Sequence, residues 1–258
     1  MVFSPARVRW HALRELWFFR GFLRLTSVRV AMRAERDHEL MMTMPIVCVL
    51  GLVAGMLLFV VLPTSLKEQS ATVLATLWPL WVVQAAPMIC AQCMAIQNAP
   101  AIALRLTEAQ ERGSFGVSDA QGGQRDGLVA RMAVPWIAAH ATVCAAAACL
   151  LVVFALCFGL LAALVLAVGD LRTTMDVVFA RVPPLVWVRA GFSAWLLGAV
   201  CALSAVLYAW PGSQTARTAH AAHRTGLRAM FAASLACAAT GSAMNWVAGL
   251  LGWNGLVG

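Results

Sequence analysis

Residue types that could carry out chemistry are few in this sequence, and their patterns are weak. Cys90 and Cys93 form a CxxC pair, a spacing that can hold a metal or a redox disulfide. The pair stands alone in an apolar segment, without a second pair or a nearby acid, so packing is the favoured interpretation. His220 and His223 have helical spacing in a basic loop, where solvated histidines are favoured over ligands. We therefore expect no metal site.

Two further groups have polar side chains near apolar segments. Glu35, Asp37, His38 and Glu39 resemble a ligand cluster, but they also suit the polar start of a helix. His140 is the one histidine inside an apolar stretch, where a hydrogen-bonded packing role is favoured over ligation. The apolar stretches contain no carboxylate, and a proton-coupled carrier usually needs one there. No nucleophile–base–acid arrangement is visible, so no catalytic residues are predicted.

Nucleotide chemistry is also not expected in this chain. The P-loop pattern needs a lysine after its second glycine, and the only lysine here is Lys67, between Leu66 and Glu68. The sequence therefore predicts a protein that is not itself an enzyme and needs no cofactor. If its activity is driven by ATP, a separate subunit must hydrolyse the ATP.

The composition shows which elements must carry these residues. The 258 residues are 62% hydrophobic and 12% charged, with a mean hydropathy of +0.80, which indicates an integral membrane protein. The net charge of +8 lies beside apolar spans, so an anionic lipid surface is a better partner than nucleic acid. All eight cysteines lie in apolar segments, which argues against a disulfide framework.

The expected fold class is an all-α integral membrane protein. Residues 7–37 are rich in arginine and aromatic residues, and they predict a helix in the membrane interface within a cytoplasmic or interfacial region of residues 1–40. A transmembrane domain of residues 41–258 follows, with a hydrophilic loop at 105–131. Its five expected spans are Met41–Pro63, Ala71–Leu104, Met132–Gly169, Ala190–Trp210 and Met230–Trp253.

The second of these spans organises the rest of the chain. Ala71–Leu104 is free of charge, and as one helix it would measure about 50 Å, against about 30 Å for a bilayer core. It is too long for one simple span and too short for two. It also holds prolines and polar residues that are costly in lipid, which predicts a proline-broken or re-entrant helix lining a cavity. These residues are Pro79, Pro87, Pro100, Gln84, Gln92, Gln97 and Asn98.

The positive charges predict the orientation. With a cytoplasmic N-terminus, fifteen of the 19 Lys and Arg residues lie on the inner side and four on the outer side. The four are Lys67, Arg172, Arg181 and Arg189. Five crossings then place the C-terminus outside.

In order and spacing, these features resemble the permease subunits of Mla-type ABC lipid transporters, the MlaE/YrbE family. Pro45-Ile46-Val47, Gly51 and Gly55-Met56 match the pattern of the family's first span. Pro87 matches the proline of its long broken stretch, and Gly123-Gln124-Arg125-Asp126 with Val134-Pro135 match the approach to its next span. The last cytoplasmic loop, with Arg228 and Ser234, matches loosely, and the resemblance covers about residues 10–255.

The sequence departs from the family at its charged motifs. The family's Gly-Arg pair reads Ile96-Gln97 here, and its Ala-Glu pair reads Leu104-Arg105. The Glu-Gln of the family's ATPase-facing segment has no counterpart at the same place, although Asp119 and Gln121 stand near it. The chain therefore resembles a diverged member, or one half of a heteromeric permease pair.

The resemblance implies a permease that moves phospholipid, or a related lipid, between the bacterial inner membrane and a periplasmic MCE-domain carrier. It implies a cytoplasmic ABC ATPase and a second permease chain as partners. The residues expected along the lipid pathway are Gly51, Gly55, Met56, Phe59, Met88, Gln92 and Met94; ordinary helix packing is an equal alternative for each. The residues expected to couple to the ATPase are Glu111, Asp119, Gln121, Arg125 and Asp126.

Two other functions remain open on the sequence. A membrane scaffold that does not transport, or a pseudo-permease half of a heteromeric complex, would fit the loss of the family's Arg and Glu motifs. An intramembrane metal oxidase using Cys, Met and His would need bound metal in stoichiometric amount.

Overall fold

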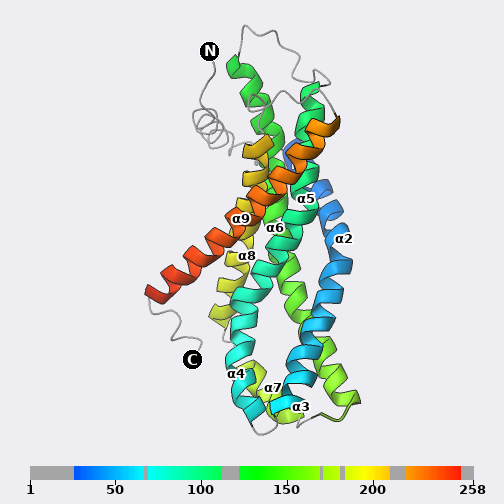
Figure 1. Ribbon diagram of the computed structural model, residues 1–258, viewed down its shortest axis with the longest axis vertical. Helices are drawn as coiled ribbons and strands as arrows, with labels where there is room; N and C mark the ends of the chain where they lie inside the picture. Colours follow the sequence, from blue (N-terminus) through cyan, green and yellow to red (C-terminus); the bar gives the residue numbers. More distant parts are fainter. Residues whose placement is uncertain are drawn as a thin grey trace. The chain divides into compact units, whose positions relative to one another are not determined.

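The structure, a computed structural model, describes residues 26–66, 69–111, 122–168, 171–180, 184–209 and 219–250, with only the backbone described at several helix ends (Figure 1). Every regular element among these residues is a helix. In chain order they are α2 (Thr26–Met56), η2 (Leu57–Val61), α3 (Leu62–Leu66), α4 (Ser70–Leu80), η4 (Trp81–Ala85), α5 (Ala86–Glu111), α6 (Gly122–Val165), α7 (Leu171–Ala180), α8 (Pro184–Ala209) and α9 (Ala219–Leu250).

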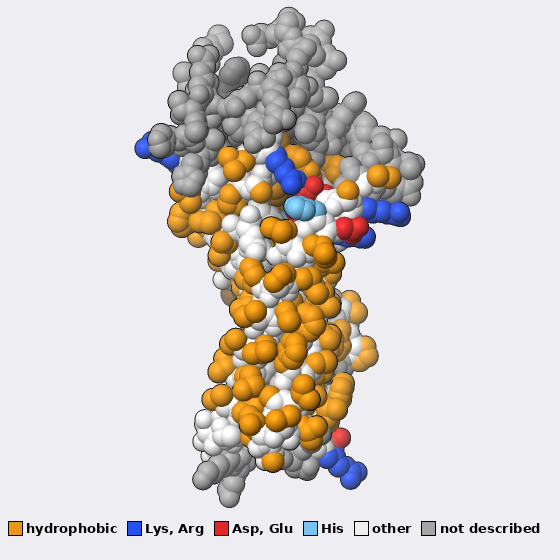
Figure 2. Space-filling view, turned by 90° about the vertical axis from the view of Figure 1, so that its right-hand side faces the viewer, with side chains coloured by type: hydrophobic (Ala, Val, Ile, Leu, Met, Phe, Trp, Pro, Cys, Tyr) orange, Lys and Arg blue, Asp and Glu red, His pale blue; other side chains and the backbone are white. Residues whose placement is uncertain are grey.

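Five helical runs are long and apolar enough to cross a membrane, and each contains most of one expected span. On the face seen in Figure 2, hydrophobic side chains cover these helices, and the described charged side chains gather toward the helix ends. The prediction of an all-α, multi-pass membrane protein is thus confirmed. The runs are Met32–Leu66, Ser70–Leu106, Ala133–Val165, Val186–Tyr208 and Arg224–Leu250.

Several element boundaries differ from those expected. The helix of the first span begins at Thr26, so the last part of the expected interfacial segment is continuous with that span. Residues 1–25 lie outside the described part of the chain. The expected loop at 105–131 is shorter, because α5 continues to Glu111 and α6 begins at Gly122. Helix propagation explains this, since a formed helix extends readily through Arg, Glu and Gln.

The stretch Ser70–Glu111 is one continuous helical run, so the re-entrant alternative is wrong. The helix is interrupted only locally, as the proline-broken alternative predicts: its hydrogen bonding changes from α to π geometry over Trp81–Ala85. Pro87 lacks an N–H group and its ring clashes with the carbonyl of residue 83, which disfavours ordinary α bonding at this point. A π turn accommodates the proline without ending the helix.

The chain divides into two compact units, which we describe separately. The first unit contains residues 1–39, 92–142 and 198–237, and the second contains residues 40–91, 143–197 and 238–258.

In the second unit, α2 and α6 approach closely at three glycines. A Cβ atom on Gly51 would lie 2.5 Å from Cβ of Phe154, and one on Gly55 would lie 2.8 Å from the backbone N of Gly159. On the other side, a Cβ on Gly159 would meet the ring of Phe59. The four-residue spacing of Gly51 and Gly55 therefore serves helix packing within the chain, as small-xxx-small faces do.

Four short elements of the second unit, η2, α3, α4 and α7, pack against one another. The ring centroids of Phe59 and Trp78 are 5.5 Å apart in an edge-to-face arrangement, which joins η2 to α4. Helix α4 also packs against α3 and α7, and the three lie together in Figure 1. The buried aromatic pair thus fixes the start of the long second span.

In the first unit, polar contacts join helices that are far apart in sequence. Glu35 on α2 forms an ion pair with Arg105 on α5. Glu39, one turn further along α2, lies with its Oε1 3.3 Å from His140 Nδ1 on α6, and the two side chains are 5% and 0% exposed. Gln92 Nε2 on α5 donates to the carbonyl oxygen of Ser234 on α9 at 3.0 Å. Carboxylate contacts thus hold one face of α2 to two other helices.

Two polar residues singled out in the sequence meet in this unit. Glu39 precedes the apolar stretch Met41–Pro63, so that stretch still contains no carboxylate, and Glu39 is buried within the same helix. The hydrogen-bonded packing role expected for His140 is confirmed by its contact with Glu39.

Candidate functional site

A pocket with a volume of about 320 Å³ lies in the second unit, between the first half of α8 and the last half of α9. Val83, in the π turn η4, forms part of its wall. The other lining residues are Arg189, Phe192, Ser193 and Leu196 on α8, and Thr240, Ala243, Met244, Asn245, Val247 and Ala248 on α9.

The spacing of the lining residues follows from helix geometry. On α8 they are separated by three, one and three residues, and on α9 the series 240, 243, 244 and 247 repeats that spacing. Positions i, i+3, i+4 and i+7 share one face of an α-helix. The pocket is therefore the space between two facing helix stripes, where small residues such as Ala243 and Ser193 leave room.

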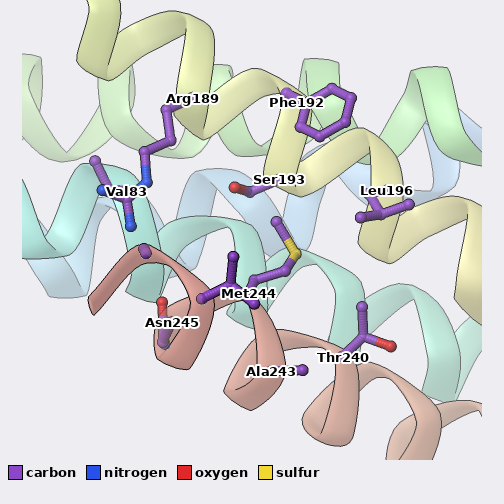
Figure 3. Close-up of a pocket in the computed structure, with 11 residues that line it drawn as sticks. Val83, Arg189, Phe192, Ser193, Leu196, Thr240, Ala243, Met244 and Asn245 are labelled. Atoms are coloured by element: carbon purple, nitrogen blue, oxygen red, sulfur yellow. The ribbon is translucent and has the colours of Figure 1, made fainter. Parts of the chain in front are cut away.

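Arg189 and Asn245 lie at one end of this pocket, Ser193 lies midway along it, and Thr240 lies toward the other end. Figure 3 shows Arg189 reaching from α8 toward Val83, with Asn245 at the same end on α9. Phe192, Ser193 and Leu196 follow along α8, away from Arg189. Arg189 is in the second turn of α8, near the start of the candidate span Val186–Tyr208, and the rest of the pocket lies further along this span.

The polar side chains of the pocket have open hydrogen-bonding capacity. Within the described ranges, no hydrogen bond or ion pair engages Arg189, Ser193, Thr240 or Asn245. Asn245 is exposed on a helix long and apolar enough to span a membrane, where an unbonded carboxamide is costly. A ligand with hydrogen-bond acceptors would satisfy these groups.

Away from the end that holds Arg189, the pocket walls are mainly apolar, with Ser193 and Thr240 as the polar exceptions. Phe192, Leu196 and Met244 are among the apolar lining residues, and the flexible thioether of Met244 extends toward α8 (Figure 3). Such an arrangement can hold a molecule with an anionic head and an apolar tail. A guanidinium can bind a carboxylate or phosphate through two parallel hydrogen bonds, and the apolar walls can cover a hydrocarbon chain.

The residues expected along a lipid pathway lie in both units, and none of the seven lines this pocket. Gly51, Gly55 and Phe59 take part in the packing of α2 against α6 and α4. Met56 lies half-buried on α2. Met88 packs on α9, where a Cβ added to Gly241 would lie 3.5 Å from the Met88 sulfur. Their place in a lipid pathway stays a prediction.

The other two expected pathway residues belong to the first unit. Gln92 is bonded to α9 through the carbonyl of Ser234, and Met94 is fully buried. The structure thus assigns a packing contact to Gln92. A place in a lipid pathway stays a prediction for both residues.

The expected ATPase-coupling residues flank the segment between α5 and α6. Glu111 is the last residue of α5, and Arg125 and Asp126 lie in the first turns of α6. The side chains of these three, and all of Asp119 and Gln121, lie outside the described residues. Their role in coupling to an ATPase stays a prediction.

The residues weighed for metal chemistry do not gather. None of the eight cysteines forms a disulfide bond. Among the described residues, no three His, Cys, Asp or Glu side chains come together as a metal site would require. Glu35 and Glu39 instead contact Arg105 and His140, and Asp37 contacts Arg36. The side chains of His220 and His223 lie outside the described residues.

Arg189 is the functional candidate that the sequence reading missed. It was assigned to the outer loop as a topology marker, but it lies in α8 and lines the pocket. The available signal was its helical spacing from Phe192, Ser193 and Leu196. The same signal existed in α9, where polar Thr240 and Asn245 interrupt an apolar span.

Neither a protein-family model nor a curated protein matches this chain.

Proposed function

We propose that this chain is the membrane permease subunit of an ATP-driven lipid transporter of the MlaE/YrbE kind. The observation that carries this proposal is the pocket between α8 and α9, apolar along its walls and cationic at one end. Lipids have that distribution of polar and apolar groups, and ions do not. The pocket also opens in a helix pair that is long and apolar enough to cross a membrane.

The predicted orientation gives this pocket a place in transport. With a cytoplasmic N-terminus, the start of α8 and the end of α9 face the periplasm, so Arg189 lies at the level of the outer headgroups. Lipid held there would be near a periplasmic MCE-domain carrier. The membrane in this proposal is the bacterial inner membrane, and the direction of lipid movement is left open.

The energy source in this proposal is a separate cytoplasmic ABC ATPase, because the sequence lacks a P-loop. The ATPase would bind at residues 112–121 and the adjoining helix ends, with Glu111, Arg125 and Asp126 beside it. A second permease chain, identical or different, would complete the membrane part.

The test is purification of the full chain from its native membrane, followed by identification of bound proteins and measurement of ATP hydrolysis. We expect an ATPase to co-purify, and we expect replacement of residues 113–120 by a Gly-Ser linker to abolish this association. A matched replacement of residues 212–216, in the loop before α9, serves as the control and should leave the ATPase bound.

If the loop replacement changes neither assembly nor ATP hydrolysis, the permease proposal fails. The alternative of a membrane scaffold would then be preferred. One observation favours it: Arg105, at the place of the family's glutamate, forms an ion pair with Glu35 within this chain. That arginine therefore has a structural contact here, where the resembling family has a carboxylate.

A further inference from the structure

The pocket between α8 and α9 has features that specify its ligand more closely than the word lipid does. Its single cation is Arg189, and no carboxylate in the described part of the chain neutralises it. The polar side chains near it, Asn245 and Ser193, are uncharged donors. The polar end therefore carries one positive charge that no described carboxylate balances. This charge favours an anionic headgroup, and the described residues of the site offer no anionic group to pair with the ammonium of a zwitterionic headgroup.

The size of the pocket limits the apolar part of the ligand. A volume of about 320 Å³ is near the lower end of the 300–1,000 Å³ typical of small-molecule pockets. From Arg189 to Leu196 the α8 wall is about 10 Å long, at about 1.5 Å per residue. One acyl chain can follow this wall, and a second chain would have to lie outside it.

The π turn contributes to this shape. Val83 is 4% exposed and lies in η4, where Figure 3 places it beside the end of Arg189. Val83 thus forms part of the wall at the polar end, where Arg189 is half-buried. A guanidinium that is partly shielded from water binds an anion more strongly than one on an open surface.

From these features we propose that the pocket binds a single-chain anionic lipid, with its phosphate or carboxylate on Arg189 and Asn245 and its acyl chain along Phe192, Leu196 and Met244. This inference rests on the proposed lipid function, because it names the lipid class for the same site. The lipid supplied to this site would be the product of a reaction that removes one acyl chain from a membrane phospholipid.

The binding test uses the full chain in detergent, titrated with octanoyl lysophosphatidate, whose short chain matches the length of the α8 wall, and followed by native mass spectrometry. We expect one bound lipid per chain at the high-affinity site. Octanoyl lysophosphatidylcholine, which has the same chain and a zwitterionic head, should bind at least tenfold more weakly. Dioctanoyl phosphatidate, which has the same head and two chains, should also bind more weakly than the single-chain lipid.

Two pairs of variants locate the binding site. Arg189→Gln should lower the affinity for lysophosphatidate about tenfold or more, because it removes a charge-assisted hydrogen bond. Arg172→Gln, which removes an exposed arginine of the same unit outside the pocket, should change it little. Ala243→Trp should fill the pocket and abolish binding, whereas Ser242→Trp, on the neighbouring exposed position, should not.

The results separate the inference from the function on which it rests. Equal affinity for the zwitterionic and anionic lipids, or equal effects of the two tryptophan variants, would overturn the inference while ATPase association could still stand. Loss of ATPase association with intact lysophosphatidate binding would overturn the transporter and leave the site. Thermal unfolding of each variant shows whether a loss of lipid binding reflects misfolding. A photo-crosslinking acyl probe provides a second test of the site, because it should label peptides from α8 and α9.

Discussion

Among single residues, Glu39 and His140 form the contact whose loss we expect to cost most. Both are buried, and they join α2 to α6 across 101 positions of sequence. Removing one partner of a buried pair leaves the other without a hydrogen-bond partner, which lowers stability. Replacing both partners by apolar residues can leave the stability nearly unchanged.

His140→Leu should therefore lower the free energy of unfolding by about 3–5 kcal/mol, because it strands the Glu39 side chain in an apolar environment. The double variant Glu39→Leu/His140→Leu should recover most of that loss. Unfolding by denaturant in mixed micelles measures both. Asp37→Asn, which disrupts the exposed contact with Arg36, is the control and should have little effect. A double variant less stable than His140→Leu would contradict this account.

At the scale of elements, the contact between α2 and α6 depends on the absence of side chains. Gly55 allows the backbone of α6 to approach, and the atoms that a side chain would meet there are backbone atoms of Ala155 and Gly159. Backbone in a packed helix pair cannot move aside as a flexible side chain can, so the two helices would have to separate.

Gly55→Leu should destabilise the second unit by about 1–3 kcal/mol or more, as overpacked cores usually do. Gly191→Leu is the matched control, because nothing lies within 4 Å of a Cβ at that position in α8. Melting temperatures in detergent should fall for the first variant and stay close to the unmodified protein for the second. Equal melting temperatures would show that α2 and α6 do not meet at Gly55.

The π turn Trp81–Ala85 is the element that connects the prolines to the pocket. Pro87→Ala restores an N–H group and should allow ordinary α bonding, which turns residue 83 by about 100° relative to the following helix. In a cysteine-free background, Val83→Cys should then react faster with a membrane-permeant maleimide, because residue 83 leaves its buried position. Pro45→Ala, in a helix whose geometry stays α around the proline, should leave the rate unchanged.

The sequence predicted the membrane spans well, but it predicted neither the π turn nor the contacts between helices. Charge-free runs such as Ala190–Trp210 locate spans well, because charge in the bilayer is costly for any fold. The π turn could not be located, since three prolines in Ala71–Leu104 permit several breaks and only packing selects one. The Glu39–His140 contact and the pocket were missed for the same reason: periodicity gives the face of a helix but not the helix that it meets.

For the molecule as a whole, the orientation in the membrane follows from the unequal distribution of positive charge. Fifteen of the 19 basic residues were assigned to the inner side. The proposed function depends on this, because the polar end of the pocket must face the outer leaflet to serve a periplasmic carrier.

Cysteine labelling in intact cells tests the orientation. In a cysteine-free background, Lys67→Cys should react with an impermeant maleimide added outside, and Arg217→Cys should react only after the membrane is opened. The reverse pattern would place the pocket at the cytoplasmic surface and would contradict the proposed delivery to the periplasm. Permeabilised cells, in which both positions should react, control for accessibility.

The π turn also has a consequence for the length of the gene product. A π turn holds one more residue than the α turn that it replaces, so it is equivalent to a one-residue insertion in a helix. Deleting one residue within Trp81–Ala85 should therefore leave the flanking helices in register. The same deletion in α6, where the geometry is α throughout Gly122–Val165, would rotate everything after it by about 100°. Related sequences that differ by one residue in length within a span should carry that difference at one of the two π turns, residues 57–61 or 81–85.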